Sequence, residues 1–482
     1  MMRGLACVLV TVAAAGCASA PDRLETAERS PVPRPAAAAG DAALARPLPS
    51  VLPAEQVAAA QSIADAARTR GHATLADCFR LAEATNEDLL SADEDRLQAL
   101  LRRDQAIAGI QPSLSLSAYA FAQDRVAGGG SSSGGSGGGG SFSGSSDREQ
   151  WAFVVRQPVF KGFAEFRALE VARRSGEARA AVMDSLRNAL RRSVARAFFG
   201  VLAAEADVRT LEESEKLDRT RVGEMRARLE NGIARRSEVL LLESQLQQTL
   251  GSLRRARTQR DVTRAVLDEL VGVPLGLPLL DAAAPIDALP SRDAALAEAI
   301  RARPELKAAG LNSDVAEAQI AVVQSGYWPT ASFVANRYMG RSGFSSSSKE
   351  TNWDAQINLD FPFFEGGATQ ARERTARSDL RKARLAESGT LRSVVQDVES
   401  TLASAAAGAE LLGTFERNVQ IATENLALLR EEYAHGIATN LEVLTAQNNL
   451  QAAQLELERQ RLLNRLDRVE LSLALGRTET DR

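Results

Sequence analysis

Few residues in this chain of 482 have the side chains that catalysis or metal binding usually needs. There are two histidines, His72 and His435, and three cysteines. The sequence contains no serine, histidine and aspartate grouping of a hydrolase, no metal-ligand spacing and no phosphate-binding loop. Cys78 is expected to be a small buried apolar residue rather than a reactive thiol. The sequence therefore predicts no catalytic residues, no metal site and no cofactor.

The most distinctive carboxylates are Glu238 and Glu442, because each lies six residues after the glycine of a repeated motif. The residues Gly232, Ile233, Ala234, Glu238, Val239 and Leu240 recur as Gly436, Ile437, Ala438, Glu442, Val443 and Leu444, at a constant offset of 204. A single glycine turn between two helices is common, but a matched pair without insertions indicates one structural unit used twice. The simpler explanation of each glutamate is an acidic residue in the first turn of a helix, where the helix dipole favours negative charge.

Long helical segments must carry these motifs. Residues 162–232 contain no proline, and about 70 helical residues would extend about 105 Å. Helical patterns also cover residues 74–110, 232–272, 292–325, 368–432 and 436–476. A net charge of −4 and an aromatic content of 5% favour a thin helical bundle and argue against a nucleic-acid-binding surface.

Four strands are predicted near residues 113–118, 151–159, 330–339 and 353–361. The last is the clearest, with Trp353, Ala355, Ile357, Leu359 and Phe361 on one face and Asn352, Asp354, Gln356, Asn358 and Asp360 on the other. An apolar face with an aromatic residue at each end is typical of a transmembrane β-barrel, although a soluble sheet with one buried face has the same alternation. Four strands are too few to close a membrane barrel. A barrel would therefore require an oligomer.

The first 16 residues are typical of a secretory signal peptide. Cys17 follows a sequence that resembles a bacterial lipobox, with Ala14 at the usual leucine position. In a lipoprotein Cys17 would carry the lipid, and Ala18 in place of aspartate would favour the outer membrane. An ordinary signal peptide with a bystander cysteine is the alternative. The remaining divisions are a Pro/Ala-rich, lipid-anchored tether at 17–70, a first repeat at 71–272, an equatorial linker at 273–292, a second repeat at 293–476 and a tail at 477–482.

The duplicated order of helix, strand pair, long helix, glycine turn and helix resembles the TolC-type outer-membrane efflux channels. The lipobox makes the chain similar to their lipoprotein, or NodT-like, subfamily. The resemblance covers about residues 70–476 and is most specific at the Gly232 turn and at Tyr433, Gly436 and Glu442. It implies a membrane α+β fold in which a homotrimer forms a TolC-like tube. Each protomer would give four strands to a 12-stranded β-barrel that stands on a long α-helical coiled-coil barrel.

The resemblance also implies roles for single residues. Glu442, Tyr433 and Glu238 would form the periplasmic aperture, with Glu238 pairing with Tyr433. Three Glu442 carboxylates near one axis would repel one another, raise some of their pKa values and favour cations. The adaptor-contacting tips would be Gly232, Ile233 and Ala234 together with Gly436, Ile437 and Ala438. The family's arginine two residues after the second glycine is Ala438 here, and its second acidic residue is Thr445, so the salt bridge of that arginine is not expected.

The resemblance implies the outer-membrane component of a tripartite efflux system. It would be a passive exit duct for small molecules, driven by an inner-membrane pump of the RND or ABC type through a periplasmic adaptor. The chain would be lipid-anchored in the outer membrane of a Gram-negative bacterium and project into the periplasm. A duct for type I protein secretion is an alternative within the same class. A lipid-anchored periplasmic coiled-coil adaptor or spacer is the alternative from another class, but it leaves the four strands unexplained.

Overall fold

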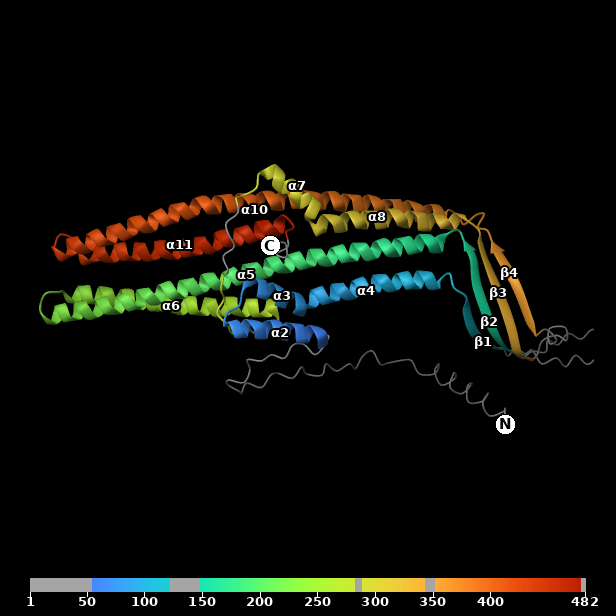
Figure 1. Cartoon of the computed structure of the whole chain (residues 1–482), viewed down its shortest axis with the longest axis horizontal. Helices are drawn as coiled ribbons and strands as arrows, with labels where there is room; N and C mark the ends of the chain where they lie inside the picture. The colour runs from blue at the N-terminus through green and yellow to red at the C-terminus, as the bar shows by residue number, and fades with distance from the viewer. Residues whose placement is uncertain (1–53, 122–147, 282–287, 343–351, 478–482) are drawn as a thin grey trace, which may run out of the picture. The chain divides into compact units, whose positions relative to one another are not determined.

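The computed structural model describes residues 54–121, 148–281, 288–342 and 352–477 (Figure 1). The predicted signal peptide, Cys17, most of the predicted tether and most of the predicted tail lie outside these segments. Two helices of 67 residues each, α5 (Ala164–Glu230) and α10 (Ala368–Ala434), are the longest elements. α6 (Arg236–Val271) packs along α5, and α11 (Asn440–Ala474) packs along α10. Corresponding helices begin 204 residues apart, which confirms the predicted duplication.

Two predicted helices are each divided in two. Residues 74–110 form α3 (Leu75–Thr85) and α4 (Glu87–Ala108), and a capping box of Thr74 and Asp77 begins α3. Between them, Asn86 has an extended backbone, and its side chain accepts a hydrogen bond from the Leu89 N–H. Residues 292–325 form α7 (Arg292–Ala302), α8 (Pro304–Gln324) and a 3₁₀ turn, η1 (Ser325–Tyr327). The break falls at Arg303 because the ring of Pro304 disfavours the helical conformation for the residue before it.

The prediction that the tether extends to residue 70 is wrong. Residues 54–70 form α2 (Ala54–Arg70), which packs on α3. Ala60, Ala64 and Ala67 are buried, and their spacing places them on one helical face. Alanine has the highest helix propensity, so the alanine-rich composition that suggested an extended tether forms a helix here.

The four strands form one antiparallel sheet in the order β1-β2-β3-β4. Their bounds are β1 (Ser113–Phe121), β2 (Arg148–Lys161), β3 (Thr330–Ser342) and β4 (Trp353–Asp360). The sheet and the two glycine turns lie at opposite ends of α5 and α10 (Figure 1). β2 has register shifts at Trp151/Ala152 and Pro158/Phe160, where one strand carries an extra residue and the ladder bends.

The sheet has one apolar face and one mostly polar face. Cross-strand pairing of Leu114 with Val155, and of Phe333 with Ile357, places these side chains on one face. Ile357 is 74% exposed in the single chain. On the other face the Asp354 carboxylate accepts hydrogen bonds from the Asn336 amide (2.7 Å) and the Tyr338 hydroxyl (2.6 Å). The register of β4 confirms the two predicted faces over Trp353–Asp360, whereas Asn352 precedes the strand and Phe361 follows it.

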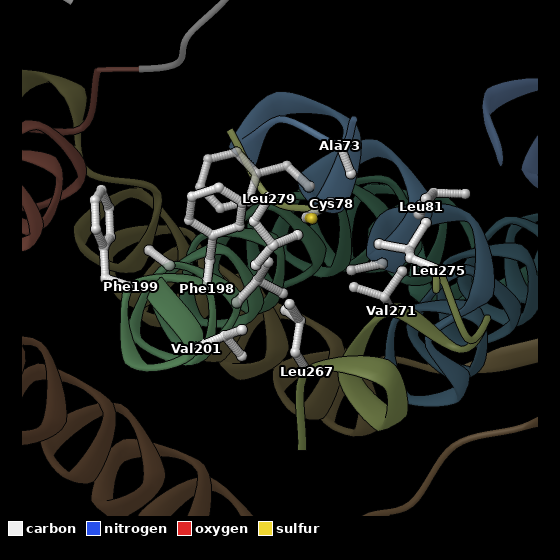
Figure 2. Close-up of a cluster of buried hydrophobic side chains, with 14 of the residues drawn as sticks. Ala73, Cys78, Leu81, Phe198, Phe199, Val201, Leu267, Val271, Leu275 and Leu279 are labelled. Atoms are coloured by element: carbon white, nitrogen blue, oxygen red, sulfur yellow. The ribbon is translucent and has the colours of Figure 1, made fainter. Parts of the chain in front are cut away.

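The largest cluster of buried apolar side chains joins α2, α3, α5 and α6 (Figure 2). Phe198 from α5, Leu267 from α6 and Leu81 from α3 are fully buried in it. Cys78 lies in the same cluster, and burial raises the pKa of its thiol to about 12. Cys78 is therefore an unreactive core residue, as predicted. None of the helices in the described segments combines the length and hydrophobicity that a membrane span requires.

An ionic cluster around the buried Arg303 holds the break between α7 and α8 against the long helices. Arg303, only 5% exposed, forms an ion pair with Asp397 of α10 and donates a hydrogen bond to the Ala474 carbonyl of α11 (2.6 Å). Arg192 of α5 donates two further hydrogen bonds to the same carboxylate, at 3.1 and 2.7 Å. The Asp397 carboxylate thus links α10 to α5 and to the break between α7 and α8, and Arg303 extends the cluster to α11.

We expect Gly272→Ala to lower the free energy of unfolding by about 2–4 kcal/mol, from left-handed backbone strain and overpacking. Gly272 has φ +72°, and an added Cβ would lie 2.6 Å from Thr85 Oγ1. That hydroxyl is held in place because it donates to the carbonyls of Leu81 and Val271, at 2.9 and 2.8 Å.

The matched control is Gly232→Ala, which has the same φ but nothing within 4 Å of an added Cβ. It should cost only the backbone strain, about 1–2 kcal/mol. Guanidinium unfolding of the detergent-solubilised protein, followed by helical circular dichroism, measures both variants. Equal losses would contradict the proposed crowding at Thr85.

Candidate functional site

The two glycine turns have the same backbone hydrogen bonds. In the first, Gly232 (φ +72°) follows the end of α5, and the Ile233 N–H donates to the Arg228 carbonyl at 2.9 Å. In the second, Gly436 (φ +74°) follows the end of α10, and the Ile437 N–H donates to the Glu432 carbonyl at 2.9 Å. This pattern satisfies the last carbonyls of a helix and needs a left-handed residue, which explains the glycines.

Both repeated glutamates accept a hydrogen bond from the N-cap backbone of the following helix, and with Thr439 the second also forms a full capping box. The Glu442 carboxylate accepts hydrogen bonds from the Thr439 N–H (2.6 Å) and hydroxyl (2.8 Å). The Glu238 carboxylate accepts from the Arg235 N–H at 3.1 Å. The backbone hydrogen bond from Thr439, followed by that of its hydroxyl, lowers the pKa of Glu442. Within one protomer, both glutamates are therefore explained as acidic residues in the first turn of a helix. Repulsion between several copies of Glu442, which would raise the pKa, stays a prediction.

The predicted pairing of Tyr433 with Glu238 is wrong. The Tyr433 hydroxyl accepts a hydrogen bond from Arg228 Nη1 at 3.3 Å, and the guanidinium carbon lies 5.7 Å from the centre of the tyrosine ring. Glu238 instead binds the backbone three residues before it, a local contact that orders little extra chain. Arg228 is therefore a site residue that the sequence analysis missed. It lies one helical turn before Gly232, and Tyr433 lies almost as far before Gly436. Their similar distances from the two turns were the sequence feature that could have suggested the contact.

Apolar side chains behind the turns join the two helical hairpins. Leu444 of α11 is buried in a cluster with Val222 and Met225 of α5 and with Val239 and Leu242 of α6. Its repeat partner, Leu240, is exposed. The duplicated motif is therefore used asymmetrically, since only the second copy packs its last leucine against the other hairpin.

The ends of both turns are exposed in the single chain. Ile233 is 78% exposed and Ile437 is 76% exposed, at equivalent positions of the two repeats. Ala234 and Ala438 are half-buried beside them. In the described segments no group of three His, Cys, Asp or Glu side chains is placed to hold a metal ion.

Comparison with known proteins agrees with this arrangement. Residues 78–273 and 295–477 match the family described as outer membrane efflux protein. The chain is 24% identical over 430 residues to outer membrane protein TolC of Escherichia coli, covering 83% of this chain and 82% of that one. It is 24% identical over 335 residues to alkaline protease secretion protein AprF of Pseudomonas aeruginosa, covering 65% of this chain and 67% of that one. Identity to nodulation protein T of Rhizobium leguminosarum bv. viciae is 28% over 246 residues, about half of each chain (48%).

The fold is also that of solved channel structures. The crystal structure of CusC superimposes with a TM-score of 0.71 at 17% identity, over 84% of this chain and 92% of that one. A sheet with one apolar face, continued by paired long helices that end in glycine turns, defines one subunit of a membrane channel. The chain belongs to the outer membrane efflux protein family, and it has the duplicated TolC-like fold.

Proposed function

We propose that three copies of this chain form a passive exit duct through the outer membrane, as the outer component of a tripartite efflux system. One observation carries the proposal: the sheet has an apolar face that is exposed in the single chain, and its edge strands β1 and β4 each pair on one side only within the described segments. Lipid does not tolerate unpaired edges. Copies of the same sheet supply the missing partners, and three copies give 12 strands.

Conductance in planar lipid bilayers tests this function directly. The purified trimer should insert and produce discrete channel openings, and it should migrate as a trimer in detergent until heated. A preparation that remains trimeric but never conducts would contradict the duct. A monomer with no membrane insertion would instead favour the periplasmic adaptor or spacer. The duct is passive and performs no chemical reaction. An inner-membrane pump would supply the energy for export.

We place the adaptor contact at the two turns, with Gly232, Ile233 and Ala234 in one tip and Gly436, Ile437 and Ala438 in the other. The exposed isoleucines supply an apolar contact at each tip. Glu442, Tyr433 and Glu238 lie just behind them, where a closing aperture would be. Cysteine crosslinking from positions 233 and 437 to a co-expressed adaptor tests this placement. An adaptor captured only from positions on the middle of α10 would refute it.

A duct for protein secretion is a second candidate. It is favoured by the similarity to AprF, whose name describes secretion of alkaline protease. Both functions share the fold, so the discriminating measurement is cellular. Deletion of the gene should sensitise cells to small toxic compounds if the duct serves efflux. It should leave a secreted protein inside the cell if the duct serves secretion.

Lipid attachment at Cys17 is also part of the proposal, supported by the lipobox-like sequence before it. Metabolic labelling with a fatty acid should mark the wild-type protein and leave Cys17→Ser unmarked. Label on both proteins would show attachment elsewhere.

Arg228→Ala is expected to raise the open probability of the channel. The Arg228 side chain contacts Tyr433 and so joins α5 to α10 beside the turns. An exposed cation–π contact corresponds to about a two- to fivefold shift in an equilibrium for each copy. Single-channel recording at neutral pH measures the change.

The matched control is Tyr433→Phe, which removes the hydroxyl but keeps the aromatic ring under the guanidinium. It should change the open probability less than Arg228→Ala does. A larger effect of the phenylalanine would show that the hydrogen bond, and not the ring contact, joins the helices.

A further inference from the structure

A buried carboxylate lies where the two helical hairpins meet. Asp218 of α5 is 3% exposed. It accepts a hydrogen bond from the Thr249 hydroxyl of α6 at 2.7 Å and another from Gln447 Nε2 of α11 at 3.2 Å. Gln447 is 5% exposed. Asp218 thus connects its own hairpin to the other one, and it lies about 21 Å along the helix from Gly232.

The neighbouring side chains also hold the two hairpins together at this position along the helices. Gln245 of α6 and Asn448 of α11 exchange hydrogen bonds through their amides, at 3.1 and 3.4 Å. Closer to the turns, Leu444 of α11 packs into the apolar cluster of α5 and α6. If the hairpins separate from their tips as far as this position, Asp218 returns to water.

The charge on Asp218 is poorly compensated. In the described segments no lysine or arginine forms an ion pair with it, and the groups that α6 and α11 present to it, Thr249 and Gln447, are neutral. Among the described residues, the charge that attracts it is Arg221 of its own helix, which is itself repelled by Arg430 of α10. Burial raises the pKa of Asp218, although the Thr249 hydrogen bond, the Arg221 charge and the Gln447 hydrogen bond act in the opposite direction.

The same glutamine has an unused acceptor, although it is the amide nitrogen that points at Asp218. Gln447 Oε1 is buried and has no hydrogen-bond partner in the described part of the chain. A protonated Asp218 carboxyl has a hydrogen to donate to it after a rotation of the amide, whereas the ionised carboxylate has none. The packed arrangement therefore suits a neutral group at position 218 better than a charged one.

We propose that Asp218 is a positioning residue that opposes the packing of the two hairpins when its carboxylate is charged and permits it when the carboxyl is neutral. The proposal rests on the proposed function, because the hairpins are assumed to close the duct. A group whose pKa is raised in the packed state binds its proton more tightly there. Packing is consequently favoured as the pH falls, and separation is favoured as the pH rises past that pKa. Each unit of difference in pKa between the two arrangements shifts their equilibrium by up to about tenfold per subunit.

The test compares wild type with Asp218→Asn at pH 5 and pH 7.5. The amide has the same shape, accepts from Thr249 and donates to Gln447 Oε1, but it never carries charge. Wild-type open probability in planar bilayers should be higher at pH 7.5 than at pH 5. The variant should stay at or below the wild-type pH 5 value at both pH values. If Asp218→Asn opens more than wild type at pH 7.5, the charged carboxylate stabilises the packing of the hairpins and the proposal is overturned. Identical behaviour of the two proteins also overturns it.

Asp207→Asn is the matched control on the same helix. Asp207 also contacts α11, but its partner there is Arg459, at 2.8 Å. Removing this ion pair should leave the pH response in place. Loss of the response in this control as well would overturn the assignment to Asp218.

A second measurement separates the proposal from the duct itself. Spin labels at positions 233 and 437 report the distance between the two tips of one subunit without any need for conduction. The distance distribution should broaden in wild type between pH 5 and pH 7.5 and remain narrow in Asp218→Asn. If no channels form but the tips respond in this way, the duct fails and the role of Asp218 stands. If channels form and the wild-type tips do not respond to pH, the role of Asp218 fails and the duct stands.

Discussion

Ile357→Arg is expected to abolish assembly of the trimer in the outer membrane. Ile357 lies in the middle of β4, on the apolar face of the sheet, and it is exposed in the single chain. An arginine facing lipid at the bilayer midplane costs about 2–4 kcal/mol, and a trimer contains three of them. Quantifying the heat-dissociable trimer in outer-membrane fractions measures the effect, and we expect little or none to remain.

The matched control is Gln356→Arg, one residue away on the opposite face of the same strand. Gln356 pairs with Val334 and shares its face with Asp354 and Asn358. That face would line a water-filled interior, so the same arginine should leave assembly intact. Equal loss of trimer in both variants would mean that the face carrying Ile357 does not contact lipid. Arg337 lies on the same face as Ile357, beside Trp353 at the start of β4.

The parts of the fold that could be predicted from sequence are those set by local rules. Long proline-free segments between glycines fixed the extent of α5 and α10 to within a few residues. Strict alternation identified the two faces of β4. The errors have equally local causes. Pro304 favours the break at Arg303, but the helical pattern on both sides of it predicts one continuous helix. The composition of α2 resembles that of a tether, although its alanine spacing suits a packed helix.

The candidate site was predictable only within each turn. The acidic residues six after Gly232 and Gly436 cap their own helices, as their first-turn positions indicated. The contacts between hairpins were not predictable. Arg228 meets Tyr433 across 205 residues, and Asp218 meets Gln447 across 229. Such contacts depend on how each helix is rotated about its axis, and one residue changes that rotation by about 100°. Sequence periodicity identifies the apolar stripe of each helix. It does not identify which polar side chains of two different helices come into contact beside that stripe.

Asp397→Asn should produce the largest loss of stability among single substitutions in the helical part of the chain, about 3–5 kcal/mol in the free energy of unfolding. The variant leaves the buried Arg303 guanidinium without its carboxylate and also unpairs Arg192. Guanidinium unfolding monitored by circular dichroism measures the change. Glu416→Gln is the control on the same helix, since Glu416 pairs with Arg461 at 3.4 Å with both side chains about half exposed. An exposed pair of this kind contributes less than about 1 kcal/mol.

The pH dependence of this loss identifies its electrostatic origin. Burial alone would raise the pKa of Asp397, but hydrogen bonds from Arg192 and Arg303, with their charges, hold it below its usual value. A carboxyl whose pKa is lowered by folding contributes stability that is fully present above the unfolded pKa, about 3.9, and is lost as the pH falls through the folded pKa. The difference between wild type and Asp397→Asn should therefore be constant from pH 5 to pH 8 and shrink only below about pH 4. A difference that is unchanged at pH 3 would show that the asparagine disturbs packing rather than charge.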